Sequence, residues 1–318
     1  MIPLADALVA AYGFGETPHC ERIVRASNDL FCIVTSGGTF WLKLANKVLR
    51  QLDDLESEAE VAAGLAARGL AVAAPVLRVD GRHVGSVELR DGWCSALLFQ
   101  NAPGAAIEEA TAAQAEALGA LVAKIHLASP VSGADRRWTI DAETLATKPL
   151  GWIGPWLLQA GHDVDALTAL SDEMAARVWT RDGTTLPSGL CHGDLQLENA
   201  RFVGDAPTLF DFEVCGVGPC VYDLACYWRK RVALAPPDTP GPEDEWKALL
   251  RGYARVRPLA AEELRAVPPL ATLRAIWTMA LPASPEARWG QDWLIDPEYF
   301  AAHLDMIERL ADAARDEP

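Results

Sequence analysis

Basic residues are outnumbered in this chain. Its 318 residues include 28 lysines and arginines against 44 aspartates and glutamates, so the formal net charge at pH 7 is −16. A nucleic-acid partner needs a basic face for its phosphates, and this balance argues against such a partner. An acidic cleft would concentrate a cationic substrate, but surplus acid also serves solubility alone. The charge therefore excludes one class of partner without naming another.

Long apolar runs and paired cysteines are also missing. Half of the residues are hydrophobic, yet no run reaches membrane-spanning length, so we expect no membrane partner. The start, Met1 to Asp6, lacks the basic residues that open a signal peptide. The seven cysteines are odd in number and form no C-x-x-C pair, which indicates reduced thiols in a cytoplasmic protein. At this length the chain has room for two lobes and a sizeable core.

A short β-hairpin is predicted near the middle of the chain. Gly204-Asp205 is a turn signal, and the runs on its two sides, 200–203 and 208–210, have strand character. Closing this hairpin brings Asn199, just before the first strand, close to Asp211, just after the second.

Asp194 precedes Asn199 by five residues, so a tight loop can place both around one cavity with Asp211. A carboxylate that orients a nucleophile, together with an amide and a carboxylate for Mg²⁺, is the set that phosphoryl transfer requires. These three side chains therefore predict a phosphoryl-transfer site.

The order of these residues resembles the motifs of aminoglycoside phosphotransferase-like kinases, a superfamily that also contains choline, homoserine and stress-response kinases. The pieces that carry the resemblance are His192-Gly193-Asp194, Asn199, Asp211-Phe212-Glu213 and Tyr222-Asp223-Leu224-Ala225. The resemblance implies an α+β, two-lobed, protein-kinase-like fold, with a small N-terminal antiparallel sheet plus one helix and a larger, mainly helical C-terminal lobe. It implies ATP and Mg²⁺ as cofactors, Asp194 as the catalytic base, and Asn199 and Asp211 as metal ligands.

Alternating runs over the first hundred residues predict the antiparallel sheet. They are 20–26, 30–35, 39–44, 71–79, 85–89 and 93–99. Lys43 stands alone among apolar neighbours in the third run, and a lysine there is costly to bury unless it meets an anion. The helix predicted over 53–68 can supply one, because Glu58 shares a face with the apolar Leu65. By the resemblance, the Lys43–Glu58 pair positions the α- and β-phosphates of ATP.

Two further nucleotide contacts are implied by the resemblance. Residues 26–30 stand where protein kinases have a glycine-rich turn but contain no glycine, so backbone N–H groups and the Ser27 hydroxyl are expected to meet a phosphate. The break at 100–104 corresponds to the hinge, where the Gln100 carbonyl and the Ala102 N–H would read the base. Because backbone atoms read it, ATP and GTP are not distinguished. The expected lobes are 1–101 and 102–318.

The sequence also gives expectations for the segment after Asp211 and for two residues that would support the site. Glu213 replaces the glycine of protein kinases, and only residues 214–219 precede Tyr222-Asp223, so no long activation loop fits there. We expect Asp223 to cap the following helix and to hold the catalytic loop. His126 is expected to be a packed, hydrogen-bonded histidine.

The acceptor is expected to lie against the C-terminal residues. The loop 288–294 mixes polar and aromatic residues, as beside a sugar, amine or peptide, and Asp292 and Asp296 are candidate contacts for an amine. We predict a kinase that phosphorylates a small-molecule hydroxyl on an amino sugar or aminoglycoside, an amino alcohol or a homoserine-like metabolite. The helix containing Arg274 is similar to one in bacterial stress-response kinases, so a protein serine/threonine kinase is the alternative, followed by a non-catalytic nucleotide-binding protein.

Overall fold

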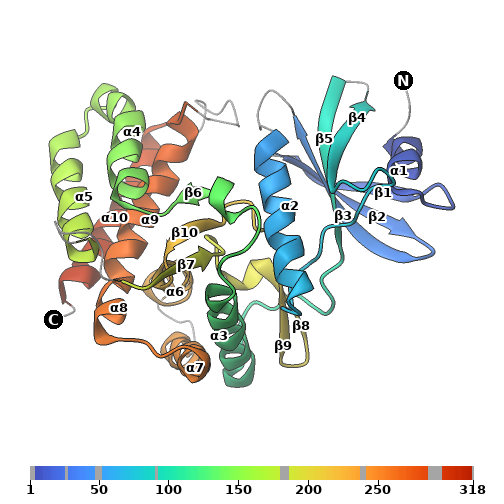
Figure 1. The fold of residues 1–318 in the computed structure, drawn as a ribbon. Coiled ribbons are helices and arrows are strands. Elements are labelled where there is room, and N and C mark those ends of the chain that lie inside the picture. The colour runs from blue at the N-terminus through green and yellow to red at the C-terminus, as the bar shows by residue number, and fades with distance from the viewer. Residues whose placement is uncertain are drawn as a thin grey trace.

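The computed structural model describes residues 4–25, 28–46, 52–89, 92–179, 186–236, 241–285 and 296–316. They form an N-terminal lobe built on an antiparallel sheet and a larger, mainly helical C-terminal lobe (Figure 1). The expected α+β, two-lobed architecture is therefore confirmed. Within these ranges, no helix combines the length and the apolar character that crossing a bilayer would need. All seven cysteines are free thiols, as expected.

The N-terminal sheet has five strands in the order β1-β2-β3-β5-β4, and each neighbouring pair is antiparallel. The strands are β1 (His19–Arg25), β2 (Asn28–Thr35), β3 (Gly38–Asn46), β4 (Val84–Leu89) and β5 (Gly92–Gln100). Thr35 pairs with Gly38 across the turn between β2 and β3. The runs expected over 30–35 and 39–44 are therefore strands, because alternating side chains are a local signal.

The strand predicted over 71–79 does not form. Val72 makes a single bridge with Leu209 of the C-terminal lobe, and Pro75 makes a single bridge with Phe99 on β5. Proline has no N–H to donate, so a continuous ladder cannot run through Pro75. The segment instead connects the sheet to the β-hairpin of the other lobe, where Ala73 donates its N–H to the Leu209 carbonyl.

The two faces of the sheet pack against different helices, α1 (Leu4–Tyr12) and α2 (Leu52–Ala67). Leu42 and Leu44 on β3 share one core cluster with Leu8 of α1. Successive side chains of a strand point to opposite faces, so Lys43 between them points toward α2. The alternation that builds the sheet therefore also aims the only charged side chain of this strand at the helix that carries Glu58.

Helix α9 forms the centre of the C-terminal lobe. Most of its residues are buried, including Arg274 and Trp277, and it packs against α4, α5, α6 and α10. The helices of this lobe are α3 (Ala112–Leu127), α4 (Lys148–Gln159), α5 (Val164–Val178), α6 (Val221–Trp228), α7 (Pro242–Val256), α8 (Ala261–Arg265), α9 (Val267–Ala280) and α10 (Pro297–Asp316). Short helical turns are η1 (Ala134–Arg136), η2 (Glu143–Thr147), η3 (Leu197–Asn199), η4 (Arg229–Ala233) and η5 (Leu281–Ala283).

Helices α3 and α7 touch through two glycines. A β-carbon at Gly119 would overlap the Leu249 carbonyl of α7, and one at Gly252 would overlap the Glu116 carbonyl of α3. Only glycine allows two backbones to approach this closely. Arg251 of α7 also forms an ion pair with Glu116 over 3.0 Å at the same crossing.

Two small sheets carry the motif region. The first has the order β6-β10-β7, formed by β6 (Trp138–Thr139), β10 (Gly216–Pro219) and β7 (Ser188–Cys191). The second is the predicted hairpin of β8 (Ala200–Val203) and β9 (Ala206–Leu209), which turns at Gly204. The Phe210 N–H donates to the Asn199 carbonyl over 3.0 Å, so closing the hairpin brings Asn199 beside the residue that precedes Asp211, as predicted.

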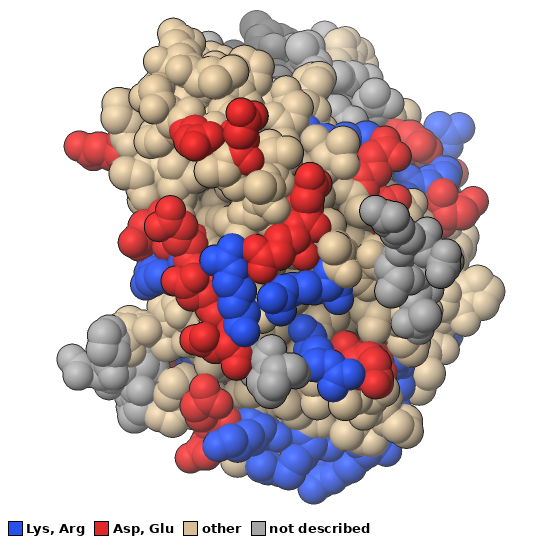
Figure 2. Space-filling model, turned by 90° about the vertical axis from the view of Figure 1, so that its left-hand side faces the viewer, with Lys and Arg blue, Asp and Glu red and all other residues tan. Residues whose placement is uncertain are grey.

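The acid surplus is not gathered into one patch on the face shown in Figure 2. Acidic and basic side chains lie next to one another across the middle of this face, on the side of the molecule where Figure 1 places α5 and α10. One such pair joins these helices, since Arg315 of α10 contacts Glu173 of α5 over 2.7 Å.

Candidate active site

Asp223 fixes the loop that carries Asp194 through hydrogen bonds to the loop backbone. This carboxylate is fully buried and accepts the N–H groups of His192 over 2.7 Å and Gly193 over 2.8 Å. Gly193 has φ 84°, and a β-carbon there would overlap the Val214 carbonyl oxygen, so only glycine fits this turn. The expectation that Asp223 holds the catalytic loop is confirmed. It does not cap α6, because its side chain faces the loop rather than the start of that helix.

His126 completes this support. Its Nε2 lies 2.9 Å from Asp223, and its Nδ1 lies 2.7 Å from the Tyr253 hydroxyl, so it is the packed, hydrogen-bonded histidine that was expected. Burial alone would raise the pKa of the Asp223 carboxyl. The hydrogen bond and charge of His126, with the Gly193 N–H, outweigh burial and lower the pKa of Asp223 below its usual value.

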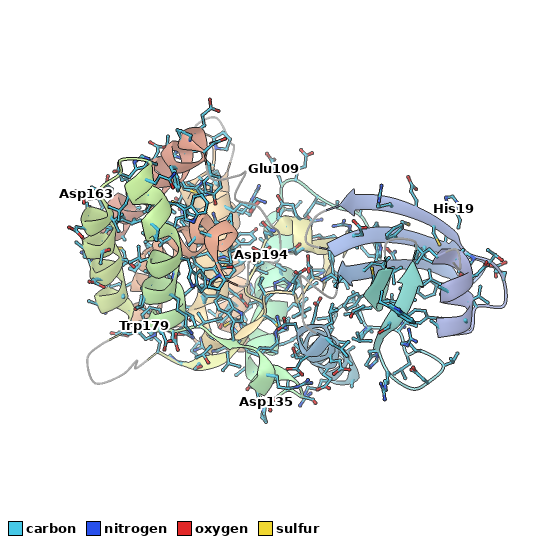
Figure 3. All side chains as sticks on the ribbon, turned by 90° about the horizontal axis from the view of Figure 1, so that it is seen from above. His19, Glu109, Asp135, Asp163, Trp179 and Asp194 are labelled. Carbon is cyan, nitrogen blue, oxygen red and sulfur yellow. The ribbon has the colours of Figure 1, made fainter. Side chains whose placement is uncertain are left out.

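Asp194 lies near the middle of the molecule, between the helical lobe and the sheet (Figure 3). Its Oδ2 accepts hydrogen bonds from Gln196 Nε2 over 2.8 Å and Asn199 Nδ2 over 3.0 Å. Its Oδ1 lies 3.2 Å from Arg274 Nη2. About a third of the side chain stays exposed, so the carboxylate is fixed by three neighbours and still reachable by a ligand.

The Asn199 side chain is buried, and hydrogen bonds from its amide nitrogen fix its orientation. Nδ2 donates both to the backbone carbonyl of Asp194 over 2.9 Å and to its carboxylate. The amide oxygen of Asn199 therefore lies on the side opposite to these bonds. An oxygen in that position is a suitable ligand for a hard cation.

Asp211 follows β9 in a left-handed conformation, with φ 67°. It is the only non-glycine residue with positive φ in the described part of the chain, and such outliers cluster at functional sites. Its Oδ1 lies 2.7 Å from Lys43 Nζ, while much of its carboxylate remains exposed. The unusual backbone thus aims a charged oxygen at the cavity between the lobes.

Lys43 is buried and meets three carboxylates. Its Nζ lies 2.6 Å from Glu58, 2.7 Å from Asp211 and 3.5 Å from Glu213. Glu58 is fully buried on α2, so the predicted Lys43–Glu58 ion pair is present. Two buried charges are tolerated because each satisfies the other.

A cavity between the lobes leads from this cluster to the end of β5. Its walls are mostly apolar and aromatic, and Gln100 and Ala102 of the expected hinge form part of its lining. Its lining residues are Leu30, Trp41, Lys43, Ala73, Phe99, Gln100, Asn101, Ala102, Arg201, Phe210 and Asp211. The cavity therefore has a charged end at Lys43 and Asp211 and an apolar end at the hinge. Ser27 lies outside the described residues, as do residues 288–294 of the expected acceptor loop.

Arg274 and Gln196 were not predicted as site residues. Arg274 is buried in the otherwise apolar helix α9, and its guanidinium lies 4.3 Å from the Trp277 ring. One charged residue inside an apolar helix was the available signal, the same one that identified Lys43. Asp296, a candidate amine contact, accepts the Tyr299 N–H over 2.7 Å at the start of α10.

Comparison with known proteins gives consistent matches. The model of the phosphotransferase enzyme family matches residues 19–259. A homoserine kinase of Brucella anthropi is 32% identical over 314 residues, which are 95% of this chain and 88% of that protein.

Two solved structures share the fold. A microcompartment-associated aminopropanol kinase has a TM-score of 0.73 at 21% identity, covering 98% of this chain and 95% of that chain. An amicoumacin kinase in complex with AMP-PNP and Ca²⁺ has a TM-score of 0.71 at 19% identity, covering 97% of this chain and 92% of that chain.

Proposed function

Because this chain belongs to the phosphotransferase enzyme family, we propose that it transfers the γ-phosphoryl group of ATP to a hydroxyl group of a small molecule. The observation that carries the proposal is one connected cluster. Asn199 contacts Asp194 through its side chain and the neighbour of Asp211 through its carbonyl, and Asp211 pairs with Lys43. These are the groups that phosphoryl transfer needs at the acceptor, the metal and the phosphates.

Asp194 is assigned to the acceptor. In the proposed step, the acceptor oxygen bonds to the γ-phosphorus while the bond from that phosphorus to the β–γ bridging oxygen breaks, and ADP leaves. The hydroxyl proton passes to the Asp194 carboxylate. Gln196 and Asn199 hold this carboxylate from one side and Arg274 from the other, so its main contribution is to orient the acceptor.

Asn199 and Asp211 are assigned to Mg²⁺. Asp211 lines the charged end of the cavity, and Asn199 lies beside Phe210, the residue that precedes Asp211. Carboxylate and amide oxygens are donors that this ion prefers. Bound Mg²⁺ neutralises charge on the phosphates. The amicoumacin kinase that shares the fold was solved in complex with AMP-PNP and Ca²⁺, which supports a nucleotide and a divalent ion as ligands.

Lys43 and Glu58 are assigned to the phosphates of the nucleotide, with Glu58 positioning the lysine. The Gln100 carbonyl and the Ala102 N–H are assigned to the base, since both residues line the apolar end of the cavity. We retain Ser27 as a proposed phosphate contact on the basis of the sequence.

A small molecule is the favoured acceptor. Strand β10 begins at Gly216, five residues beyond Asp211, so no long activation segment intervenes to bind a peptide. The Brucella anthropi relative is named a homoserine kinase, and a protein of the same fold is an aminopropanol kinase. A homoserine-like hydroxy compound or an amino alcohol is therefore the acceptor we favour.

The test is a screen of acceptors with the purified full chain, ATP and Mg²⁺. ADP formation would be measured with L-homoserine, 1-amino-2-propanol, ethanolamine, choline, kanamycin and a generic basic protein. We expect at least one small molecule to stimulate ADP formation in the wild type but not in Asp194→Asn. Labelling of the basic protein alone would indicate a protein kinase instead. Nucleotide binding without stimulation by any compound would overturn catalysis of this kind.

A further inference from the structure

A segment of the C-terminal lobe packs along helix α2 of the N-terminal lobe. The segment comprises residues 130–137, between α3 and β6, and contains η1. It lies beside α2 in Figure 1, and Figure 3 places Asp135 of this segment next to the same helix. A β-carbon at Gly133 would come within 2.8 Å of the Ser57 carbonyl oxygen of α2. The two lobes therefore meet closely along the helix that carries Glu58.

Arg137 joins α2 to the start of the segment that leads into β10. Its Nη1 donates to the Asp54 carbonyl over 3.0 Å and to the Ser57 hydroxyl over 3.1 Å, and both acceptors belong to α2. Its Nε donates to the Cys215 carbonyl over 3.1 Å, and its Nη2 donates to the Glu213 carbonyl. The guanidinium is planar and offers donors in fixed directions, so one side chain holds the two segments in a defined relative position.

The two segments that Arg137 joins carry the charged groups around Lys43. On α2, Glu58 lies 2.6 Å from Lys43 Nζ and is adjacent in sequence to one of the Arg137 contacts. In the other segment, Glu213 lies 3.5 Å from the same nitrogen, and Asp211, two residues earlier, lies 2.7 Å from it. Arg137 therefore fixes the spacing between the carboxylate that holds the lysine and the carboxylate assigned to the metal ion.

The contacts of Arg137 lie outside the groups assigned to ligands. Its acceptors are three backbone carbonyls and one hydroxyl, and none of them is assigned to the nucleotide, the metal ion or the acceptor. These bonds can therefore persist when Lys43 turns to a phosphate. In protein kinases, activation controls the position of the helix that carries the corresponding glutamate. A permanent bridge would hold α2 in place here without modification of the protein.

Arg136 also reaches α2, but on its exposed side. It forms ion pairs with Asp53 and, over 2.7 Å, with Glu60. The Arg136 side chain is 30% exposed, and the two carboxylate side chains are 63% and 43% exposed. Solvent screens such pairs, so they contribute little. Arg136 is therefore a matched control for Arg137, because the two arginines are adjacent and contact the same helix.

We propose that Arg137 is a positioning residue for phosphoryl transfer. It holds α2 against the segment that follows Asp211, so that Glu58 keeps Lys43 at the distance from Asp211 that the phosphates and the metal ion require. Arg137 itself contacts neither the nucleotide nor the acceptor. This proposal rests on the proposed phosphotransferase function.

The first test compares two substitutions on the same segment. Arg137→Gln should lower kcat/KM for ATP by roughly 10- to 100-fold, the cost of a small misplacement of the reacting groups. KM for the acceptor should stay near the wild-type value, because the contacts of Arg137 do not include Asp194. Arg136→Gln should stay within about twofold of the wild type in both quantities. Equal losses in the two variants, or a change confined to the acceptor KM, would overturn the proposal.

A double-mutant cycle with Glu58→Gln distinguishes positioning from a general structural role. If Arg137 acts through Glu58, the loss of ATP affinity caused by Arg137→Gln should be smaller once Glu58 is replaced. The reduction should be at least about threefold, which exceeds the ordinary error of additivity. Losses of the same factor in both backgrounds would show that Arg137 acts independently of the Lys43–Glu58 pair.

Calorimetric titration with ATP and Mg²⁺ separates this proposal from the proposed function. If no acceptor is phosphorylated, the function has failed, and the same comparison of ATP affinities then decides the role of Arg137. If urea titration shows that Arg137→Gln does not fold, Ser57→Ala takes its place, since it removes one of the four hydrogen bonds. Ser57→Ala should weaken ATP binding by about 3- to 10-fold, the net value of one hydrogen bond, and unchanged binding would overturn the proposal.

Discussion

Arg274 and Asp194, 80 residues apart in the sequence, form an ion pair in which Nη2 lies 3.2 Å from Oδ1. The arginine is buried in α9, and its guanidinium stacks on Trp277 of the same helix. The central helix of the C-terminal lobe is therefore connected directly to the loop that carries the candidate catalytic carboxylate.

Arg274→Met should lower kcat by about 10- to 100-fold, the cost of a small misplacement of a catalytic group. ATP affinity should change little, because Arg274 contacts Asp194 and lies outside the lining of the nucleotide cavity. Arg274→Lys should recover part of kcat, since it restores a charge without the planar guanidinium. Steady-state kinetics beside nucleotide titration would measure both effects, and a parallel loss of ATP affinity would contradict a positioning role.

Asp194→Asn should reduce phosphoryl transfer by roughly 10²- to 10⁴-fold, the usual contribution of a positioned acid or base. Nucleotide affinity should remain close to that of the wild type, because the proposed contact of Asp194 is with the acceptor and not with ATP. Asp205→Asn, in the turn of the β8–β9 hairpin, is the matched control and should leave both quantities unchanged. A calorimetric titration showing equal loss of ATP affinity in Asp194→Asn would refute this assignment.

Asp211→Asn should act on metal-dependent nucleotide binding instead. Loss of a group that only supports a metal ligand costs a metal site roughly 10- to 100-fold in affinity. Asp211 is the proposed ligand itself, so we expect ATP affinity in the presence of Mg²⁺ to fall by at least this factor. Titrations with Mg²⁺ and with EDTA would separate the metal-dependent part, which this variant should lack. If the variant and the wild type respond equally to EDTA, Asp211 is not a metal ligand.

Asp223 should make the fold sensitive to acid. Its pKa in the folded protein is lowered, because His126 and the Gly193 N–H outweigh burial, so its ionised form stabilises the fold. This contribution is complete above its unfolded pKa of about 3.9 and is lost as the pH falls through the lower folded pKa.

Asp223→Asn should therefore reduce the free energy of unfolding by about 3 kcal/mol at pH 7, as expected for breaking a buried pair. Urea unfolding from pH 7 downward should show a constant difference from the wild type until about pH 4, and a narrowing difference below it. A difference that shrinks already between pH 7 and pH 5 would assign the effect to another group.

Gly193→Ala tests the shape of the catalytic loop. Gly193 and Gly161 have similar φ values of 84° and 81°, but only Gly193 lies against another backbone group, the Val214 carbonyl. Gly161→Ala should cost only the strain of a left-handed alanine, about 1 kcal/mol, and keep activity. Gly193→Ala should cost more in thermal unfolding and abolish transfer, and equal effects of the two substitutions would show that the close approach is unimportant.

The sequence predicted the parts of the site that depend on local signals. The Gly204-Asp205 turn and the strands beside it predict the approach of Asn199 to Asp211 without further information. The Lys43–Glu58 pair could be predicted because an alternating strand and a helical face each aim one charged side chain toward the interior.

Contacts that depend on packing between distant elements could not be predicted in the same way. Nothing near Arg274 in the sequence indicates that it contacts Asp194, because the contact depends on how α9 packs relative to the loop that carries Asp194. The stacked rings of Trp138 and Trp277 likewise join β6 to α9. The strand predicted over 71–79 was wrong because an apolar pattern was weighed above Pro75, which interrupts any ladder.

The three carboxylates around Lys43 have a consequence for the order of binding events. In the free protein the lysine ammonium occupies the position of a counter-ion for Asp211, at 2.7 Å. A metal ion that takes over Asp211 would make this ammonium available to an incoming phosphate, while Glu58 keeps it from leaving. Replacement of the Lys43 ammonium by a metal ion at Asp211 would thus couple metal binding to nucleotide binding. Each ligand should then raise the affinity of the protein for the other.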